Sequence, residues 1–189
     1  MFQKKWIWII GIMIFTLWWV ASYETPTAYS RSEWKHWVDE NKNCRNTRAE
    51  VLIAQSIEPV TFRDTRTCRV AMGLWICPYT GDSIREASRI DIDHVVPLRE
   101  AHLSGGFRWS SKQKLQFAND LELPQLLAVS ASANRSKGAR DPALWMPTDS
   151  SYWCKYLADW QKIKRHYGLR VDLSEFIAIQ RIKWKHCRR

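Results

Sequence analysis

A strand that stops at a proline is the feature that most constrains how this chain can fold. Residues 91–98 read Asp-Ile-Asp-His-Val-Val-Pro-Leu, so polar and apolar residues alternate before Pro97. Alternation indicates a strand with one buried face, and proline cannot continue a ladder because it has no amide hydrogen. Asp93 and His94 stand together near the end of this strand. The segment therefore predicts a strand end that carries a hard oxygen ligand beside a base.

A second strand and a helix are predicted about thirty residues further along. Residues 125–129 form a short apolar run after Pro124, and Ser130 or Ser132 is suited to cap a helix that carries Asn134. The intervening residues 98–120 contain Gly105-Gly106 and predict two short helices around a loop. The expected order is thus strand, insertion, strand, helix.

The rest of the chain predicts helices around a small hairpin, which makes the fold class α+β. Helical spacing in residues 31–56 indicates two helices broken around 41–46. Residues 69–76, with Gly73 in the middle, predict a hairpin followed by a turn at 78–81. Two further helices are expected, the first amphipathic, at residues 149–167 and 172–184. A length of 189 residues suits one domain, assigned to residues 31–189 after a linker at 23–30.

The N-terminus has the pattern of a targeting segment. Lys4 and Lys5 precede an apolar run, residues 6–21, that is shorter than the roughly 20 residues of a comfortable membrane-spanning helix. Residues 1–22 therefore predict either a cleaved signal peptide or an uncleaved membrane anchor. Both alternatives place the remainder outside the cytoplasm, as a secreted, periplasmic or cell-surface protein.

Export makes disulfides the expected state of the cysteines. Cys68 and Cys77 flank the predicted hairpin and are the pair expected to bridge. The other three, Cys44, Cys154 and Cys187, leave one odd thiol if two bridges form. The chain has no C-x-x-C pair, which argues against a structural zinc site.

The charge balance predicts a polyanionic partner. Lys and Arg number 29 against 19 Asp and Glu, a net charge of +10, and the last residues, 181–189, form a basic tail. Nucleic acid, an anionic membrane surface and an acidic wall polymer all fit such a charge.

Several separated motifs together resemble one enzyme family, the exported HNH (ββα-metal) endonucleases of bacteria. They agree in order and spacing over residues 51–167, and they comprise Tyr79-Thr80-Gly81, the segment 91–98, Glu100-Ala101, Ser104-Gly105, Trp109, residues 117–120, residues 126–129 and Asn134-Arg135-Ser136-Lys137-Gly138. The resemblance implies a ββα-metal core with an insertion between the strands, and metal-dependent hydrolysis of DNA, with RNA as an alternative substrate. Low sequence preference is expected because the chain has no separate recognition module.

The resemblance also implies roles for individual residues. His94 would be the general base, and Asp93 and Asn134 would hold one divalent cation, Mg²⁺ or alternatively Mn²⁺ or Ca²⁺. The family commonly has an asparagine just before the second strand that steers the histidine; here Gln125 stands at that place, and Asn119 is the alternative.

Three basic residues near the predicted helix, Arg135, Lys137 and Arg140, are candidates to bind phosphate.

Two alternatives to a nuclease remain open at this point. One is a catalytically silent DNA-binding protein of the same fold, and the other is a basic structural protein of the wall or membrane.

Overall fold

The structure, a computed structural model, describes residues 25–187. The predicted signal peptide or anchor, residues 1–22, lies outside the described residues, and residues 25–30 of the expected linker have no regular secondary structure. Within residues 25–187, no helix is both long and apolar enough to cross a membrane.

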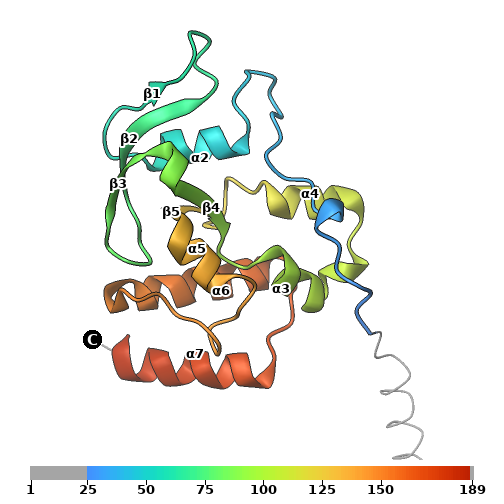
Figure 1. Cartoon of the computed structure of the whole chain (residues 1–189). Coiled ribbons are helices and arrows are strands. Elements are labelled where there is room, and N and C mark those ends of the chain that lie inside the picture. The colour runs from blue at the N-terminus through green and yellow to red at the C-terminus, as the bar shows by residue number, and fades with distance from the viewer. Residues whose placement is uncertain (1–24, 188–189) are drawn as a thin grey trace, which may run out of the picture.

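A two-stranded antiparallel hairpin followed at once by a short helix forms the centre of the molecule (Figure 1). Strand β4 (Ile90–His94) pairs with β5 (Leu126–Ser130), so that Asp91 lies opposite Val129 and His94 opposite Leu126. Helix α5 (Ala131–Lys137) begins after Ser130, whose side chain accepts a hydrogen bond from the Ala133 amide. The predicted strand, second strand and capped helix are therefore all present.

The insertion between β4 and β5 contains the short helices that its sequence predicts. They are α3 (Leu98–Leu103), the 3-10 turn η3 (Gly106–Arg108) and α4 (Ser111–Ala118). Ser110 and Gln113 form a reciprocal capping box at the start of α4, which satisfies amides that the helix leaves free.

A separate three-stranded antiparallel sheet corrects one expectation. Its strands are β1 (Thr61–Phe62), β2 (Val70–Ile76) and β3 (Ser83–Glu86), in the order β1-β2-β3. The hairpin predicted within residues 69–76 is wrong, because β2 continues through Gly73 as one strand, with a shift in its register against β3 between Met72 and Trp75. A Cβ there would lie 2.6 Å from the Trp75 ring, so the glycine serves close packing and not a turn. The turn at 78–81 is present.

The remaining helices surround the two sheets. They are η1 (Arg31–Glu33), α2 (Thr47–Gln55), η2 (Ala87–Arg89), η4 (Ser150–Tyr152), α6 (Trp153–His166) and α7 (Leu173–His186). The first of the two helices expected in residues 31–56 is only the single turn η1. Beyond it the backbone leaves helical geometry, and Trp37 has a φ of 59°.

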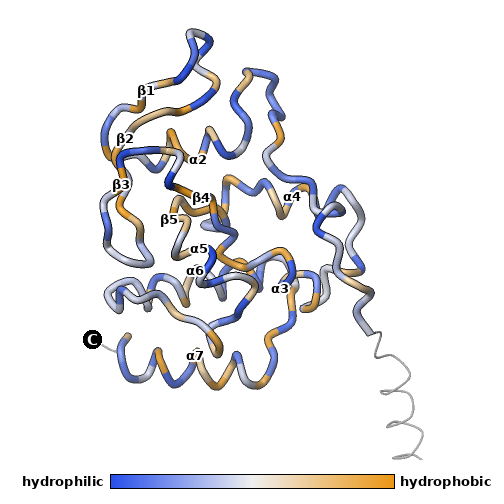
Figure 2. Tube along the Cα trace, in the orientation of Figure 1, coloured by the Kyte–Doolittle hydropathy of each residue, from blue (hydrophilic) through white to orange (hydrophobic). Residues whose placement is uncertain are grey.

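One hydrophobic cluster joins these elements, from Trp34 near the N-terminus to Ile179 on α7. Apolar residues colour much of β2 and β5 (Figure 2), and Ile90 and Ile92 of β4 also belong to the cluster. The free edge of β5 is covered by Gln55 of α2, whose amide nitrogen donates to the Leu126 carbonyl and whose amide oxygen accepts from the Ala128 amide. β5 is thereby hydrogen-bonded along both of its edges, to β4 and to Gln55, since buried backbone groups need partners.

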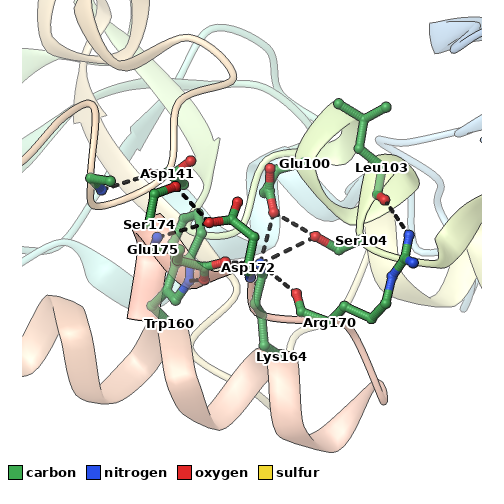
Figure 3. Close-up of polar contacts among 11 residues, drawn as sticks. Glu100, Leu103, Ser104, Asp141, Trp160, Lys164, Arg170, Asp172, Ser174 and Glu175 are labelled. Carbon is green, nitrogen blue, oxygen red and sulfur yellow. Dashed lines mark hydrogen bonds and ion pairs between the residues drawn. The ribbon is translucent and has the colours of Figure 1, made fainter. Parts of the chain in front are cut away.

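A buried lysine ties the insertion to the C-terminal helices (Figure 3). The ammonium of Lys164 on α6 lies 2.7 Å from Glu100 of α3 and 2.6 Å from Glu175 of α7. It also donates to the Ser104 hydroxyl and the Arg170 carbonyl. With these acceptors around it, the buried ammonium is satisfied, and the cluster has a structural role.

Two disulfides replace the expected pairing of Cys68 with Cys77. The bridges join Cys44 to Cys68 and Cys154 to Cys187, while Cys77 is a buried free thiol that accepts a hydrogen bond from the Ser130 amide. The expectation depended on a hairpin between the two cysteines. Because β2 is a continuous strand of seven residues, it holds its ends roughly 20 Å apart, too far for a bridge.

Candidate functional site

His94 is held by one ring nitrogen at the end of β4. Its Nε2 lies 2.9 Å from the carbonyl oxygen of Ala118, the last residue of α4. A carbonyl can only accept, so Nε2 carries the proton and Nδ1 has the lone pair of a neutral imidazole. Nδ1 makes no hydrogen bond with any residue between 25 and 187. The ring therefore has a fixed tautomer and one unused acceptor.

Burial controls the charge of this imidazole. The His94 side chain is 6% exposed, and the Trp37 ring stacks on it at 5.8 Å between centroids. Burial lowers the pKa of His94 to about 3, although the hydrogen bond to Ala118 acts in the opposite direction. His94 is thus uncharged at neutral pH, and the segment with His36 and Trp37 covers one side of its ring.

Asn119 contributes to the position of His94 through its neighbours. Its amide oxygen accepts from the Thr47 hydroxyl and the Val38 amide, and its amide nitrogen donates to the carbonyls of Lys35 and Leu115. These bonds fix the end of α4, where the adjacent Ala118 carbonyl binds His94. Within residues 25–187 the Asn119 side chain forms its hydrogen bonds with other groups and none with the imidazole, so its effect is indirect.

Gln125, the residue favoured from sequence to orient His94 through a backbone contact, bonds to the backbone two residues beyond the histidine. It is fully buried, and its amide forms two hydrogen bonds with the backbone of Val96, accepting from the amide at 3.1 Å and donating to the carbonyl at 2.9 Å. The Gln125 carbonyl also accepts from the Val95 amide at 2.8 Å. Gln125 therefore prolongs the hairpin just beyond His94 and anchors its backbone.

Asp93 forms a buried ion pair with Lys137. The ammonium of Lys137 lies 2.7 and 3.0 Å from the two carboxylate oxygens and 2.7 Å from the His94 carbonyl, and the Tyr79 hydroxyl donates to Asp93 at 2.6 Å. Burial raises the pKa of Asp93 and lowers that of Lys137, while the ion pair opposes both shifts. Lys137 is fully buried, so the expectation that it contacts nucleic acid is wrong for this conformation: its charge is used inside the protein.

Asn134 faces Asp91 and not Asp93. Its amide nitrogen donates to an Asp91 carboxylate oxygen at 3.0 Å. The side-chain periodicities of β4 and α5 explain this pairing. Residues 91 and 93 share one face of the strand, and residues 134 and 137 share one face of the helix. Asn134 thus meets Asp91 and Lys137 meets Asp93, which corrects the expected pairing of Asp93 with Asn134. His94, on the opposite face of β4, is directed toward α4.

The two carboxylates, Asp93 and Asp91, differ in how well they fit a divalent cation. At Asp93 both oxygens already accept hydrogen bonds, and the ammonium of Lys137 stands where a cation would approach. Asp91 and Asn134 are half-buried and bring a carboxylate and an amide together, which are donor types that Mg²⁺ accepts. Residues 25–187 contain no group of three or more His, Cys, Asp or Glu side chains arranged around a common point. A two-ligand site at Asp91 and Asn134 is the arrangement that fits.

The two other predicted phosphate contacts lie on the surface, in different clefts. Arg135 is exposed on α5 and lines a cleft with Arg89 and Ser132. Arg140 is also exposed, but its guanidinium donates to the Lys137 carbonyl, and it lines a cleft beside α3 that also contains Asp141 and Asp172. Only Arg135 is on a cleft wall next to the start of α5.

Comparison with known proteins gives one informative relative. The chain is 40% identical over 151 residues to an uncharacterized secreted protein of the fungus Arthroderma benhamiae, a match that covers 80% of this chain and 72% of the relative. This chain belongs to the same family. The family therefore includes a protein described as secreted, which agrees with the export expected from residues 1–22.

Two other comparisons gave no match. No protein-family model matches the chain. No solved structure matches it either.

Tyr79 and Trp37 contribute to the site in ways that the sequence analysis missed. Tyr79 contacts Asp93 across fourteen residues of sequence, and Trp37 covers His94 from a segment more than fifty residues away. Neither contact has a local sequence signal. The pairing of Lys137 with Asp93 did have a sequence signal, because Asp93 follows Asp91 by one strand repeat and Lys137 follows Asn134 by about one helical turn.

Proposed function

We propose that this protein is an exported, metal-dependent endonuclease that hydrolyses phosphodiester bonds of DNA with little sequence preference. The observation that carries the proposal is the state of His94: an oriented, neutral imidazole with Nδ1 unused. A general base needs an available lone pair and a fixed direction, and His94 has both. It would accept the proton of the attacking water.

A pKa of about 3 makes His94 a weak base in the covered state. A bound phosphate would change this, because a nearby negative charge favours the protonated imidazole and raises the pKa. The substrate would also have to displace or pass Trp37, whose ring now stacks on His94. Basicity would therefore increase when the anionic substrate arrives.

The cation of the proposed enzyme would be held by Asp91 and Asn134. When bound, Mg²⁺ would supply positive charge to neutralise the phosphate. Asn134 would have to rotate its amide so that the oxygen, and not the nitrogen, faces the cation. Lys137 would keep Asp93 neutralised and so fix the end of β4 beside the base.

A second candidate function is a DNA-binding protein without catalysis. The buried Lys137 ammonium at Asp93 and the covered face of His94 favour it. A plasmid-cleavage assay on the full exported chain separates the two functions. The enzyme should convert supercoiled plasmid to nicked and linear forms with Mg²⁺ or Mn²⁺ and stop with EDTA. Retention of plasmid in a gel shift without any cleavage, under all metals tried, would favour the binding protein.

A further inference from the structure

An arginine-lined cleft lies apart from His94, between α2 and the loop that joins β1 to β2. Its volume is about 630 Å³, and Arg48, Arg63, Arg66 and Arg69 line it. None of the residues between 25 and 187 that line it carries a carboxylate. The cleft beside α3 differs, because Asp141 and Asp172 accompany the arginines there.

Three of these arginines are available to a ligand. The side chains of Arg63, Arg66 and Arg69 are exposed and make no hydrogen bond or ion pair with any residue in the described range 25–187. Arg48 differs: it is half-buried and donates to the carbonyls of Ala87 and Ile90, so it fixes the floor of the cleft. Unpaired guanidinium groups around one hollow favour a ligand that carries several negative charges.

The loop that carries the arginines is held in place. The disulfide between Cys44 and Cys68 links it to the segment before α2, and Arg45 donates to the carbonyl and hydroxyl of Thr67. Asp64 accepts from the amides of Cys68 and Arg69 and so directs its own charge toward the backbone. A fixed loop loses less conformational entropy when a ligand binds.

The cleft leads toward the candidate catalytic elements. Ile90, which accepts a hydrogen bond from Arg48, directly precedes Asp91 on β4. Ser88 lines this cleft and also the neighbouring one, which contains Arg89 and Arg135 and touches the start of α5. Basic side chains thus follow one path from the β1–β2 loop to the helix of Asn134.

We propose that the cleft between α2 and the β1–β2 loop binds the phosphate backbone of duplex DNA, with Arg63, Arg66 and Arg69 as its contacts. The inference rests on the proposed nuclease function, of which the cleft would be a substrate-positioning site away from the bond that is cut. Regularly spaced phosphates suit such a row of arginines, and contacts to phosphate carry no sequence preference.

The test compares two variants of the full chain that remove the same charge. One carries Arg63→Gln, Arg66→Gln and Arg69→Gln; the control carries Lys112→Gln, Lys162→Gln and Arg165→Gln, which are exposed on α4 and α6. Binding to a short fluorescent DNA duplex is measured in EDTA, where cleavage is off, over a series of salt concentrations. Circular dichroism and thermal unfolding verify that both variants are folded.

The cleft variant should bind DNA about tenfold or more weakly at low salt, and its salt dependence should lose about two to three units of slope. The control should change affinity by less than about threefold. Equal affinities for the two variants would overturn the cleft. The proposal would also be overturned if the cleft variant lost affinity for an anionic polysaccharide such as heparin and kept its affinity for DNA. Plasmid cleavage by the wild-type chain with Mg²⁺ is measured separately. The proposed DNA-binding cleft can therefore be disproved while the nuclease function is supported, and DNA binding in the cleft can be supported for a protein that does not cleave DNA.

Discussion

Lys137 places its ammonium 2.7 Å from a carboxylate oxygen of Asp93, inside the protein. The same nitrogen donates to the His94 carbonyl. The residue expected to hold a metal is therefore neutralised by a lysine of the following helix. This ion pair holds the candidate site together, because it joins α5 to the end of β4 beside His94.

Removing Lys137 should destabilise the fold strongly. Lys137→Met leaves the Asp93 carboxylate buried without its ammonium, and we expect a loss of ~3–5 kcal/mol in the free energy of unfolding. Urea unfolding measures it. Adding Asp93→Asn to the variant should recover part of the loss. The matched control is Arg85→Gln, which breaks the exposed pair with Glu58 and should change the free energy of unfolding little, because solvent screens an exposed pair. Similar losses for Lys137→Met and Arg85→Gln would contradict the buried pair.

The stability of the protein should fall in acid partly because of His94. Its pKa is about 3 in the folded state and near 6.5 when unfolded, so between these values the unfolded chain binds the extra proton. The free energy of unfolding should therefore decrease as the pH falls from about 6.5 to about 3, by ~3–5 kcal/mol from this group. His94→Gln keeps an amide donor for Ala118 and should show a smaller decrease in urea unfolding over that interval. Parallel curves for the two proteins would argue against a buried neutral His94.

Cations should stabilise the protein through Asp91 and Asn134. A ligand that binds only the folded state at about 100 times its Kd adds ~2.7 kcal/mol, which raises the Tm. We expect Mg²⁺ or Mn²⁺ to raise the Tm of the wild-type chain, and Asn134→Ala or Asp91→Asn to abolish the shift. Glu122→Gln, at an exposed carboxylate, is the charge control. If Asp93→Asn abolishes the shift and Asp91→Asn does not, the cation site has been assigned to the wrong carboxylate.

The disulfide assignment leaves Cys77 as the free thiol. Peptide mapping of the non-reduced protein should find the pairs Cys44–Cys68 and Cys154–Cys187, and alkylation should label Cys77 only after unfolding. Cys77→Ser should keep both bridges, whereas Cys44→Ser should lower the free energy of unfolding by ~2–4 kcal/mol. A Cys68–Cys77 peptide would show that β2 is not the continuous strand described.

Sequence patterns were sufficient for the elements of the site but not for its contacts. Alternation and proline located β4, and the serine before Asn134 marked the start of α5. Those signals are local. The partner of Cys68, by contrast, depended on whether residues 70–76 form one strand or two, and a central glycine is compatible with both.

The errors within the site have a common physical origin. Asp93 was assigned to a metal because of its neighbour His94, yet which side chain faces it is decided by how α5 lies across the hairpin. Likewise, the group that orients His94 is a backbone carbonyl at the end of α4, and every residue type has one. Tertiary contacts between backbone and side chain leave little trace in a single sequence.

The most direct test of the account is the plasmid-nicking rate of the wild-type chain compared with His94→Gln, both with Mg²⁺. Thermal unfolding first establishes that the variant is folded, and a gel shift in EDTA establishes that it still binds DNA. A general base typically contributes 10²–10⁴-fold. We expect EDTA-sensitive nicking by the wild type and a rate lower by about 10²-fold or more in His94→Gln, with DNA affinity unchanged. Equal nicking by both proteins, or no nicking by the wild type with any divalent cation, would contradict it.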